Sequence, residues 1–201
     1  MNPEPFFTEM NIRRAVFLDR DGTINKEVGY LRRIEDLVLI EGAGSGICLL
    51  NKSGYKVAVI TNQSGIARGF FDEIFVRKVH EEMARRLSKS NAYVDRWYYC
   101  PHHPTEGKGE YRVECGCRKP LPGMVDLAIK ELGIVPEESF VVGDSIRDLE
   151  IAWRVGAKPV LVLTGYGKET LSRLLPDQKE RLPHIASDLF NACEWICGYC
   201  W

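Results

Sequence analysis

Two carboxylates stand two residues apart in the segment Asp19-Arg20-Asp21-Gly22-Thr23, directly after the apolar run at residues 15–18. A carboxylate can attack phosphorus to form an aspartyl-phosphate, and a second carboxyl group can protonate the leaving oxygen and then activate water. Gly22 permits the tight turn that folds Asp21 back over Asp19. Because a carboxylate and a phosphate dianion repel each other, this chemistry requires a hard divalent cation with oxygen ligands, most simply Mg²⁺.

Polar residues that suit the same chemistry follow later in the chain. Thr61 and Asn62 come after the apolar run at residues 56–60, and their side chains can donate hydrogen bonds to phosphate oxygens. Asp144 follows another apolar run and can complete the coordination of the metal ion, while Lys119 can neutralise charge on the transferring group. An isolated Asp-x-Asp-Gly-Thr segment is also compatible with a solvated turn, but these later residues favour a catalytic site.

Four residues of metal-binding type bracket one polar loop: Cys100, His102, Cys115 and Cys117. The intervening residues 103–114 have few apolar side chains, so burial cannot order them. A tetrahedral Zn²⁺ held by three thiolates and one imidazole would order this loop, and it would be structural because no coordination position stays open. His103 is the rival imidazole, and we prefer His102 because one residue separates it from Cys100, the same spacing as in the second pair. Reduced cysteines without a metal are the alternative.

The elements that position these residues follow from the apolar patterning. Buried strands are predicted near residues 15–18, 56–60, 96–100, 139–142 and 159–163. Helical periodicity lies between them, in a segment around Ile47 that Gly54 closes and at residues 71–87, 124–132 and 146–155. This alternation predicts an α/β fold, a Rossmann-like parallel sheet with helices on both faces. Ligands bind beyond the carboxyl ends of such strands, where Asp19, Thr61 and Asp144 would meet.

Length and composition fit a single domain over residues 1–201, with the zinc loop at residues 100–117 as an insertion. The 27 basic and 28 acidic residues give a net charge of -1, which does not indicate nucleic-acid binding. No run approaches the ~20 apolar residues of a membrane span. Met1–Glu9 has no secretory signal character, so we expect a cytoplasmic protein whose seven cysteines form no disulfide scaffold.

The order of these motifs resembles the haloacid dehalogenase superfamily of phosphotransferases. Its four motifs are an Asp-x-Asp-x-Thr turn, a strand-terminal Thr or Ser, a Lys and an acidic cluster. This sequence supplies them in that order, between residues 15 and 165, as Asp19-Arg20-Asp21-Gly22-Thr23, Thr61, Lys119 and Gly143-Asp144.

Within the superfamily, the sequence most resembles the D-glycero-D-manno-heptose 1,7-bisphosphate 7-phosphatases, and the zinc-bearing histidinol-phosphate phosphatases share much of the set. The segments that carry the resemblance are Phe17–Asn25, Gly29-Tyr30, Thr61–Gly69, Cys100–Pro104, Cys117–Pro120 and Pro122–Met124. Both groups imply a Mg²⁺-dependent phosphomonoesterase with a minimal cap, in which loops, including the zinc loop, shape the substrate site.

The resemblance also implies roles for individual residues. Asp19 would be the nucleophile and Asp21 the general acid and base. Asp19, the backbone carbonyl of Asp21, and Asp144 would hold Mg²⁺. Thr61 and Lys119 would stabilise the transferring phosphoryl group. The expected substrate-binding residues are Glu27, Val28, Gly29, Tyr30, Asn62, Gln63, Ser64 and Arg118.

The expected function is removal of the 7-phosphate from a heptose bisphosphate on the way to surface lipopolysaccharide, by a monomer whose partner is a small phosphorylated sugar. Histidinol-phosphate phosphatase is the alternative enzyme. A zinc-stabilised binding module without catalysis and a polynucleotide 3′-phosphatase are further alternatives. The intact acidic and Lys residues argue against the binding module, and the neutral charge argues against the nucleic-acid enzyme.

Several residues stay outside this assignment. Heptose bisphosphatases often carry a basic residue after the fourth-motif Asp, but Ser145 stands there in this chain. Arg147 lies two positions on, and a helix would turn it away by about 200°. Arg68 would either reach a second phosphate or remain solvated. His80 is expected at the surface. The cysteines of the C-terminal segment are expected to be ordinary thiols: Cys193, Cys197 and Cys200.

Overall fold

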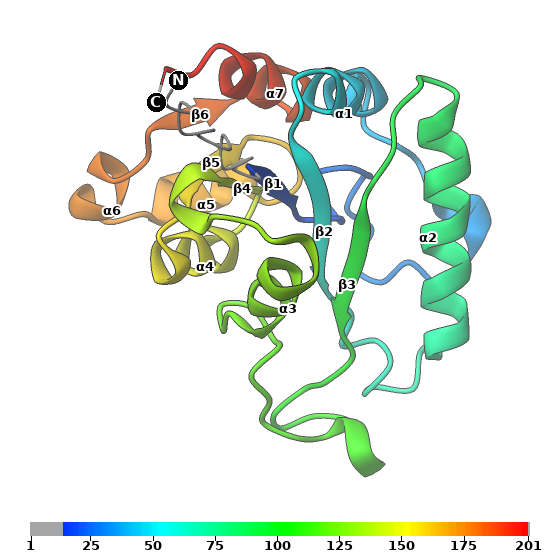
Figure 1. Ribbon diagram of the computed structural model, residues 1–201. Helices are drawn as coiled ribbons and strands as arrows, with labels where there is room; N and C mark the ends of the chain where they lie inside the picture. Colours follow the sequence, from blue (N-terminus) through cyan, green and yellow to red (C-terminus); the bar gives the residue numbers. More distant parts are fainter. Residues whose placement is uncertain (1–13, 201) are drawn as a thin grey trace, which may run out of the picture.

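Six short strands in the computed structural model, which describes residues 14–200, form one sheet in the order β3-β2-β1-β4-β5-β6 (Figure 1). All neighbouring strands are parallel. The strands are β1 (Ala15–Leu18), β2 (Lys56–Asn62), β3 (Arg96–Cys100), β4 (Phe140–Gly143), β5 (Lys158–Val162) and β6 (His184–Ala186).

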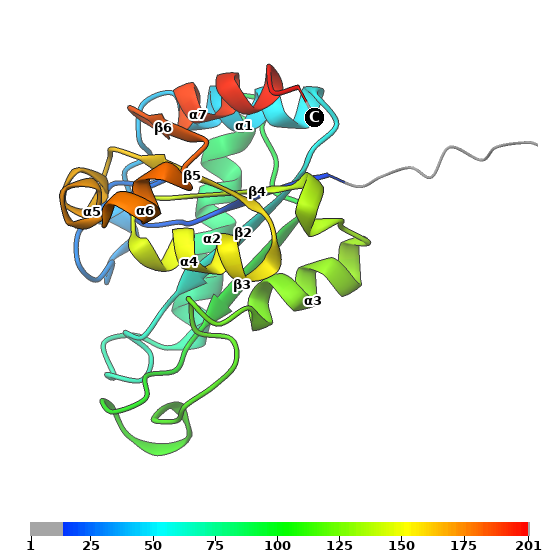
Figure 2. The ribbon, with the colours of Figure 1, turned by 90° about the vertical axis from the view of Figure 1, so that its left-hand side faces the viewer.

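Helices cover both faces of the sheet, as the sequence predicted (Figures 1 and 2). On one face lie α1 (Ala43–Lys52), α2 (Glu73–Ser88) and α7 (Leu189–Cys197). On the other face lie α3 (Gly123–Leu132) and α4 (Ile146–Val155). The remaining short helices are α5 (Gly167–Arg173), α6 (Pro176–Glu180) and the 3₁₀ turns η1 (Ile34–Asp36), η2 (Gly109–Tyr111) and η3 (Pro136–Glu138).

Successive side chains of β1 point to opposite faces of the sheet, so this strand packs into the apolar cluster on each face and sets the direction of the residue that follows it. Val16 and Leu18 pack into the cluster with α1, α2 and α7, while Ala15 and Phe17 pack into the cluster with α3 and α4. All four side chains are fully buried. Burial of each large apolar side chain contributes about 1.5–3 kcal/mol, so a slip of this strand by one residue is strongly disfavoured. Asp19 is therefore presented at a defined position beyond the strand end.

The observed strands differ from the predicted ones in two places. β2 extends to Asn62 because Thr61 and Asn62 continue the ladder with Tyr99 and Cys100 of β3. The three-residue strand β6 was not predicted because its sequence is short and contains His184. It is held by pairing with β5, a tertiary contact that local patterning does not reveal.

Two loops leave the carboxyl edge of the sheet and lie against each other, at the bottom of Figures 1 and 2: residues 63–72 after β2 and residues 101–122 after β3. The backbone N–H of Lys108 donates to the carbonyl of Ala67 at 3.2 Å. Gly107 packs so closely that a Cβ there would lie 2.1 Å from the same oxygen. Within residues 14–200, loops rather than an inserted domain stand over this edge, in agreement with the expected minimal cap.

None of the helices within residues 14–200 combines the length and apolar character needed to cross a membrane. The sequence-based expectation about a secretory signal concerns Met1–Glu9, which lies outside the described residues.

Candidate active site

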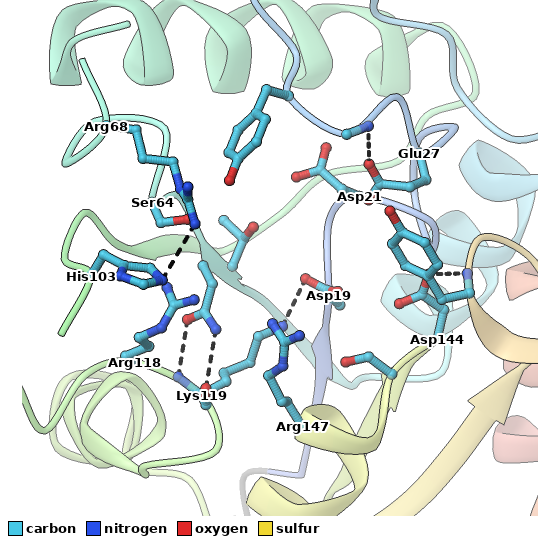
Figure 3. Close-up of a pocket in the computed structure, with 16 residues that line it drawn as sticks. Asp19, Asp21, Glu27, Ser64, Arg68, His103, Arg118, Lys119, Asp144 and Arg147 are labelled. Atoms are coloured by element: carbon cyan, nitrogen blue, oxygen red, sulfur yellow. Dashed lines mark hydrogen bonds and ion pairs between the residues drawn. The ribbon is translucent and has the colours of Figure 1, made fainter. Parts of the chain in front are cut away.

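The carboxyl edge of the sheet holds a cavity of about 450 Å³ that brings most of the predicted site residues together (Figure 3). Asp19 enters it from the end of β1, Asp144 from the end of β4, and Lys119 from the loop before α3. The Lys119 ammonium lies 2.7 Å from Asp19 Oδ1. Oxygens of Asp19, Asp144 and Asp148 lie within 4.8 Å of one another, a spacing that allows a shared cation.

The acidic pair at the centre of the cavity is electrostatically costly without a cation. Burial raises the pKa of Asp19 to about 7, although the charge of Lys119 opposes the shift. Burial, followed by the negative charge of Asp19, raises the pKa of Asp144 to about 8. Two buried carboxylates at this separation resist simultaneous ionisation. A divalent cation with oxygen ligands would relieve that repulsion, so the donor set fits Mg²⁺.

Asp148 completes the buried charge network, although the sequence analysis did not single it out. Its Oδ1 accepts a hydrogen bond from Lys119 Nζ at 2.6 Å. Its Oδ2 accepts from the Ser145 backbone N–H and hydroxyl, at 3.1 and 2.5 Å, which caps the N-terminus of α4. The spacing Ser-x-x-Asp before an apolar helix is a capping-box pattern and was the available signal. Asp148 thus orients Lys119 toward Asp19.

Asp21 points into the cavity and is held by several donors. The guanidinium of Arg20 donates to both of its oxygens, at 2.8 and 3.0 Å from Nη2. Asn25 Nδ2 donates to Oδ1 at 3.0 Å and Gln63 Nε2 to Oδ2 at 2.9 Å. Burial alone would raise the pKa of Asp21, but the charge of Arg20 and these hydrogen bonds outweigh burial and lower it.

Gly22 lets the first motif and the fourth motif approach each other. A Cβ on this residue, whose φ is 81°, would lie 2.0 Å from Asp144 Oδ2. The Thr164 hydroxyl donates to the carbonyl of Gly22 at 2.6 Å, and the Tyr166 backbone N–H donates to Asp144 Oδ2 at 2.7 Å. The segment after β5 therefore fixes Asp144 against the turn that carries Asp19 and Asp21.

The end of β2 contributes two residues to the cavity, Thr61 and Asn62. Thr61 lines the cavity, and its hydroxyl accepts a hydrogen bond from Gln63 Nε2 at 2.8 Å. The Asn62 side chain exchanges two hydrogen bonds with the Lys119 backbone, at 3.0 and 3.1 Å. Gln63 was expected to contact substrate, but it does not line the cavity and instead braces Asp21.

Three arginines also line the cavity. Figure 3 shows Arg68, Arg118 and Arg147 around the same space as Lys119, with His103 beside Arg68. Arg118 Nη1 donates to the His102 carbonyl at 3.1 Å, which ties this guanidinium to the cysteine loop. Arg68 forms an ion pair with Glu106 of the same loop. Positive charge therefore surrounds the part of the cavity that faces the loops.

The expectation that Arg147 turns away from the site is wrong. That argument counted a helical rotation from Ser145, whereas α4 begins at Ile146 and Ser145 has extended backbone angles of -122° and 155°. Arg147 therefore lies in the first turn of α4, at the cavity wall.

The segment at residues 27–30 contributes only in part to the cavity. Glu27, Gly29 and Tyr30 line it, whereas Val28 is exposed and does not. The Tyr30 ring packs edge-on against Phe70 at 4.8 Å, so this segment is held to the loop after β2.

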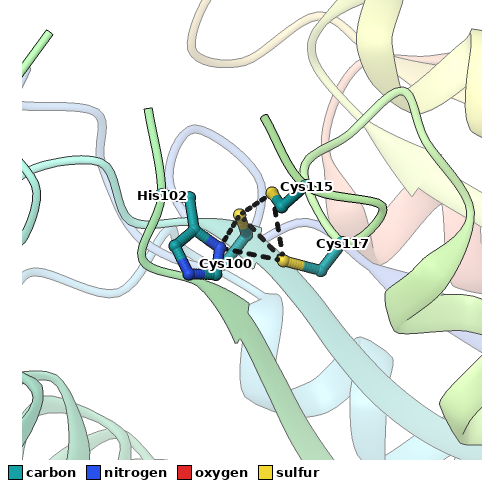
Figure 4. Close-up of side chains that lie close together, drawn as sticks. All are labelled: Cys100, His102, Cys115 and Cys117. Atoms are coloured by element: carbon teal, nitrogen blue, oxygen red, sulfur yellow. Dashed lines mark hydrogen bonds between the residues drawn. The ribbon is translucent and has the colours of Figure 1, made fainter. Parts of the chain in front are cut away.

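The cysteine loop brings together the four residues that the sequence proposed as ligands (Figure 4). The three sulfurs of Cys100, Cys115 and Cys117 lie 3.1–3.5 Å apart, and His102 Nδ1 lies 3.4 Å from the Cys117 sulfur. All seven cysteines are free thiols. In His103, by contrast, Nδ1 accepts hydrogen bonds from the backbone N–H groups of Thr105 and Glu106.

The chemistry of this donor set fits zinc. Hydrogen bonding with Cys100 lowers the pKa of Cys117 to about 5, while the pKa of Cys100 is raised, and a lowered thiol pKa favours the thiolate form that binds a metal. Thiolates and a neutral imidazole at this separation match tetrahedral zinc with Zn–S bonds of about 2.3 Å. By contrast, Cys193 belongs to the core cluster under α7 rather than to a donor cluster.

His80, expected at the surface, is 6% exposed. It stacks on Trp97 of β3 with ring centroids 4.8 Å apart, and the two rings are inclined by 23°. The expectation was wrong because it weighed the residue type and its charged neighbours in sequence, not the partner strand that covers this face of α2.

Comparison with known proteins identifies close relatives. A sequence profile described as HAD-hydrolase-like matches residues 116–192. The chain is 48% identical over 155 residues to the D-glycero-beta-D-manno-heptose-1,7-bisphosphate 7-phosphatase of Haemophilus ducreyi, covering 76% of this chain and 85% of the relative. It is 37% identical over 199 residues to the D-glycero-D-manno-heptose-1,7-bisphosphate 7-phosphatase of Chlorobaculum tepidum, covering 94% of this chain and 96% of that relative.

A solved structure has the same architecture. The D,D-heptose 1,7-bisphosphate phosphatase from B. bronchiseptica, complexed with magnesium and phosphate, superimposes with a TM-score of 0.81. The two chains are 33% identical, and the match covers 92% of this chain and 98% of that one.

Proposed function

The chain belongs to the haloacid dehalogenase-like family of heptose-1,7-bisphosphate 7-phosphatases, and from this premise we propose that it hydrolyses the 7-phosphate of D-glycero-D-manno-heptose 1,7-bisphosphate. The products are heptose 1-phosphate and inorganic phosphate. The reaction is a phosphoric monoester hydrolysis that passes through an aspartyl-phosphate.

In the first step, a carboxylate oxygen of Asp19 forms a bond to phosphorus while the bond from phosphorus to O7 breaks. Asp21 supplies the proton that the departing O7 requires. Lys119, 2.7 Å from Asp19, and Thr61 stabilise the charge on the transferring phosphoryl group. When bound by Asp19, the Asp21 carbonyl and Asp144, Mg²⁺ would offset the repulsion between nucleophile and phosphate.

In the second step, water attacks phosphorus and the bond to Asp19 breaks. Asp21, now ionised, accepts the proton of that water and is ready for the next cycle. The lowered pKa of Asp21 suits this basic role, because its carboxylate is the stable form near neutral pH. For the first step, however, Asp21 must be protonated. The negative charge of the bound phosphate dianion disfavours the ionised carboxylate, so Asp21 takes up a proton when the substrate binds.

One observation carries the proposal: the cavity that holds the buried cluster of Asp19, Lys119 and Asp148 is also lined by three arginines, two from the loops and one from the first turn of α4. The cluster suits a metal and the phosphoryl group being transferred. The arginines, named above as Arg68, Arg118 and Arg147, suit a second phosphate on the same substrate. A bisphosphate matches this division of charge better than the cationic histidinol phosphate does.

The cysteine loop supports this site as a structural element. We infer a Zn²⁺ held by Cys100, His102, Cys115 and Cys117, which orders the loop that carries Arg118 and Lys119 into the cavity. We also infer one domain over residues 1–201 and a monomeric enzyme. A heptose phosphate is an intermediate of surface-polysaccharide synthesis, so we propose a cytoplasmic location and a role in lipopolysaccharide synthesis.

The decisive test is a side-by-side comparison of kcat/KM for heptose 1,7-bisphosphate and histidinol phosphate with Mg²⁺. We expect the bisphosphate to be preferred by more than about tenfold, since a paired guanidinium–phosphate contact contributes about 1.5–3 kcal/mol. A preference for histidinol phosphate would overturn the substrate assignment. Asp19→Asn should remove turnover without loss of the fold. Absence of phosphatase activity in the folded wild-type protein would instead favour a binding module.

A further inference from the structure

Arg20 is a buried cation beside the proposed general acid and base. Its side chain is only 2% exposed, and its Nε and Nη2 groups donate to both oxygens of Asp21. The direction of the Asp21 carboxylate therefore depends on the plane in which the guanidinium lies. Arg20 precedes Asp21 in the chain, so the pair is also restricted by the turn that both residues share.

The third nitrogen of that guanidinium, Nη1, contacts His80 of α2. Arg20 Nη1 lies 3.4 Å from His80 Nε2. A guanidinium has donors and no acceptor, so this contact requires His80 Nε2 to accept the hydrogen bond. Burial and then the charge of Arg20 lower the pKa of His80 to about 3, and the imidazole is accordingly neutral and able to accept.

The ring of His80 is itself fixed by aromatic contacts. It stacks on Trp97 at 4.8 Å, and it meets Tyr99 edge-on at 6.0 Å. Tyr99 is anchored in turn, because its hydroxyl donates to Glu73 at the start of α2. The imidazole thus has little rotational freedom, and its acceptor nitrogen is presented at a defined point against Arg20.

We propose that His80 is a positioning residue: it accepts a hydrogen bond from Arg20 and so holds the guanidinium in the plane that aims Asp21 at the leaving oxygen. This role rests on the proposed function, since it assigns His80 to the general acid and base of that reaction. A neutral acceptor at this point adds order without adding charge. An apolar residue would leave a buried guanidinium N–H without a partner, and Arg20 would rotate to find one.

The test exploits the difference between leaving groups. Proton donation by Asp21 matters for a sugar alkoxide, whereas the anion released from 2,4-dinitrophenyl phosphate departs without a proton. The two matched variants are His80→Gln and His80→Met. The glutamine keeps an acceptor oxygen, whereas the methionine is similar in shape to glutamine but has no such oxygen. His80→Phe, which keeps an aromatic ring against Trp97, is a second variant without the acceptor. kcat/KM is measured for both substrates, because it reports the steps up to release of the leaving group.

For His80→Met and His80→Phe we expect kcat/KM for heptose 1,7-bisphosphate to fall by about 10–100-fold, a partial loss of the roughly 10²–10⁴-fold that general acid catalysis contributes. The value for 2,4-dinitrophenyl phosphate should change by less than about threefold, and His80→Gln should recover most of the loss on the sugar substrate. Val79→Ala, in the same turn of α2, is the control for a general loss of stability, because Val79 packs in the apolar core.

An equal fall for both substrates, or a His80→Gln variant as impaired as His80→Met, would overturn the positioning role. If His80→Phe does not fold, the comparison between the Gln and Met variants decides the matter alone. Inability of the wild-type protein to hydrolyse the sugar bisphosphate would be a different result, because it would refute the proposed function itself.

Discussion

The Lys119 ammonium lies 2.6 Å from Asp148, and the two side chains are 3% and 0% exposed. Lys119 is also 2.7 Å from Asp19, so a single buried cation bridges the proposed nucleophile and an acid that caps α4. Desolvation alone would lower the pKa of Lys119, but the two carboxylates outweigh it and raise the value. The charge that we propose to stabilise the phosphoryl group is therefore permanent near neutral pH, and Asp148 balances it.

Asp148→Ala should weaken both the fold and the reaction. Breaking a buried ion pair by removing one partner costs about 3–5 kcal/mol, and the cap on the Ser145 backbone N–H is lost as well. Lys119 would then pair with Asp19 alone and reduce its nucleophilicity, so kcat should fall by at least about tenfold. Urea unfolding and steady-state kinetics measure the two effects. Asp126→Ala, an exposed acid in the first turn of α3, is the control; an unfolding free energy for Asp148→Ala equal to that control would contradict the prediction.

The parts of the fold that the sequence predicted are those governed by apolar patterning. The run at residues 15–18 is fully buried on both faces, as a central parallel strand must be, and its polar continuation at Asp19 follows at the strand end. The same logic placed Thr61 and Asp144 at this edge. Short elements with polar sequences, such as β6, depend on a neighbouring strand and could not be predicted in this way.

The residues that sequence reasoning missed are charged or titratable groups whose burial is compensated by a specific partner in the fold. Arg20 and Asp148 belong to residue types that are usually exposed, and His80 to a type of intermediate burial, so residue type alone does not predict that all three are buried. Arg20 is compensated by Asp21, and Asp148 by Lys119 from a loop 29 residues away in sequence. A single sequence contains no signal for such pairings, except for the capping-box spacing at residues 145–148.

Gly22→Ala should abolish Mg²⁺-dependent activity. The new Cβ would lie 2.0 Å from Asp144 Oδ2, and the residue would be held at a φ of 81°, so both the carboxylate proposed to bind Mg²⁺ and the turn must shift. We expect kcat/KM to fall by at least about a hundredfold, since small displacements of reacting groups have effects of this size. Gly54→Ala separates the two causes, because Gly54 is not a cavity residue, has the same φ of 81°, and a Cβ there would meet nothing within 4 Å. Equal activity losses in the two variants would show that backbone strain, and not the approach of Asp144, is responsible.

The stability of the protein without divalent cations should decrease as the pH rises. The carboxyls of Asp19 and Asp144 titrate near 3.8 when unfolded, whereas burial raises their pKa values to about 7 and about 8 in the folded state. The folded state therefore binds more protons between these limits, and its advantage is fully present below about pH 4 and lost as the pH passes through about 7–8. Other groups add their own pH dependence, so the measured quantity is the difference between wild type and Asp144→Asn in urea unfolding with EDTA.

The difference in unfolding free energy between wild type and Asp144→Asn should change by an amount on the order of a few kcal/mol between about pH 4 and about pH 8. The wild type should become less stable relative to the variant as the pH rises. Added Mg²⁺ should stabilise the wild type more at the alkaline end, where the carboxylates are ionised, and should have less effect on Asp144→Asn. A difference that is independent of pH would refute the raised pKa values.

Cys115→Ser should remove zinc and loosen the loop that carries Arg118 and Lys119. Cys115 lies within 3.5 Å of the Cys100 sulfur, and the polar loop that it closes has little apolar surface to bury. Loss of one ligand should cost about 2 kcal/mol or more, equivalent to a fall of about 4–8 °C in Tm for a chain of this size. Elemental analysis of the purified variant should show loss of zinc, and KM for the bisphosphate should rise because Arg118 is tied to the His102 carbonyl. Cys200→Ser, at an exposed cysteine outside the cluster, should leave zinc content and Tm unchanged. A wild-type protein that is purified without zinc, and whose Tm Cys115→Ser leaves unchanged, would contradict the zinc site.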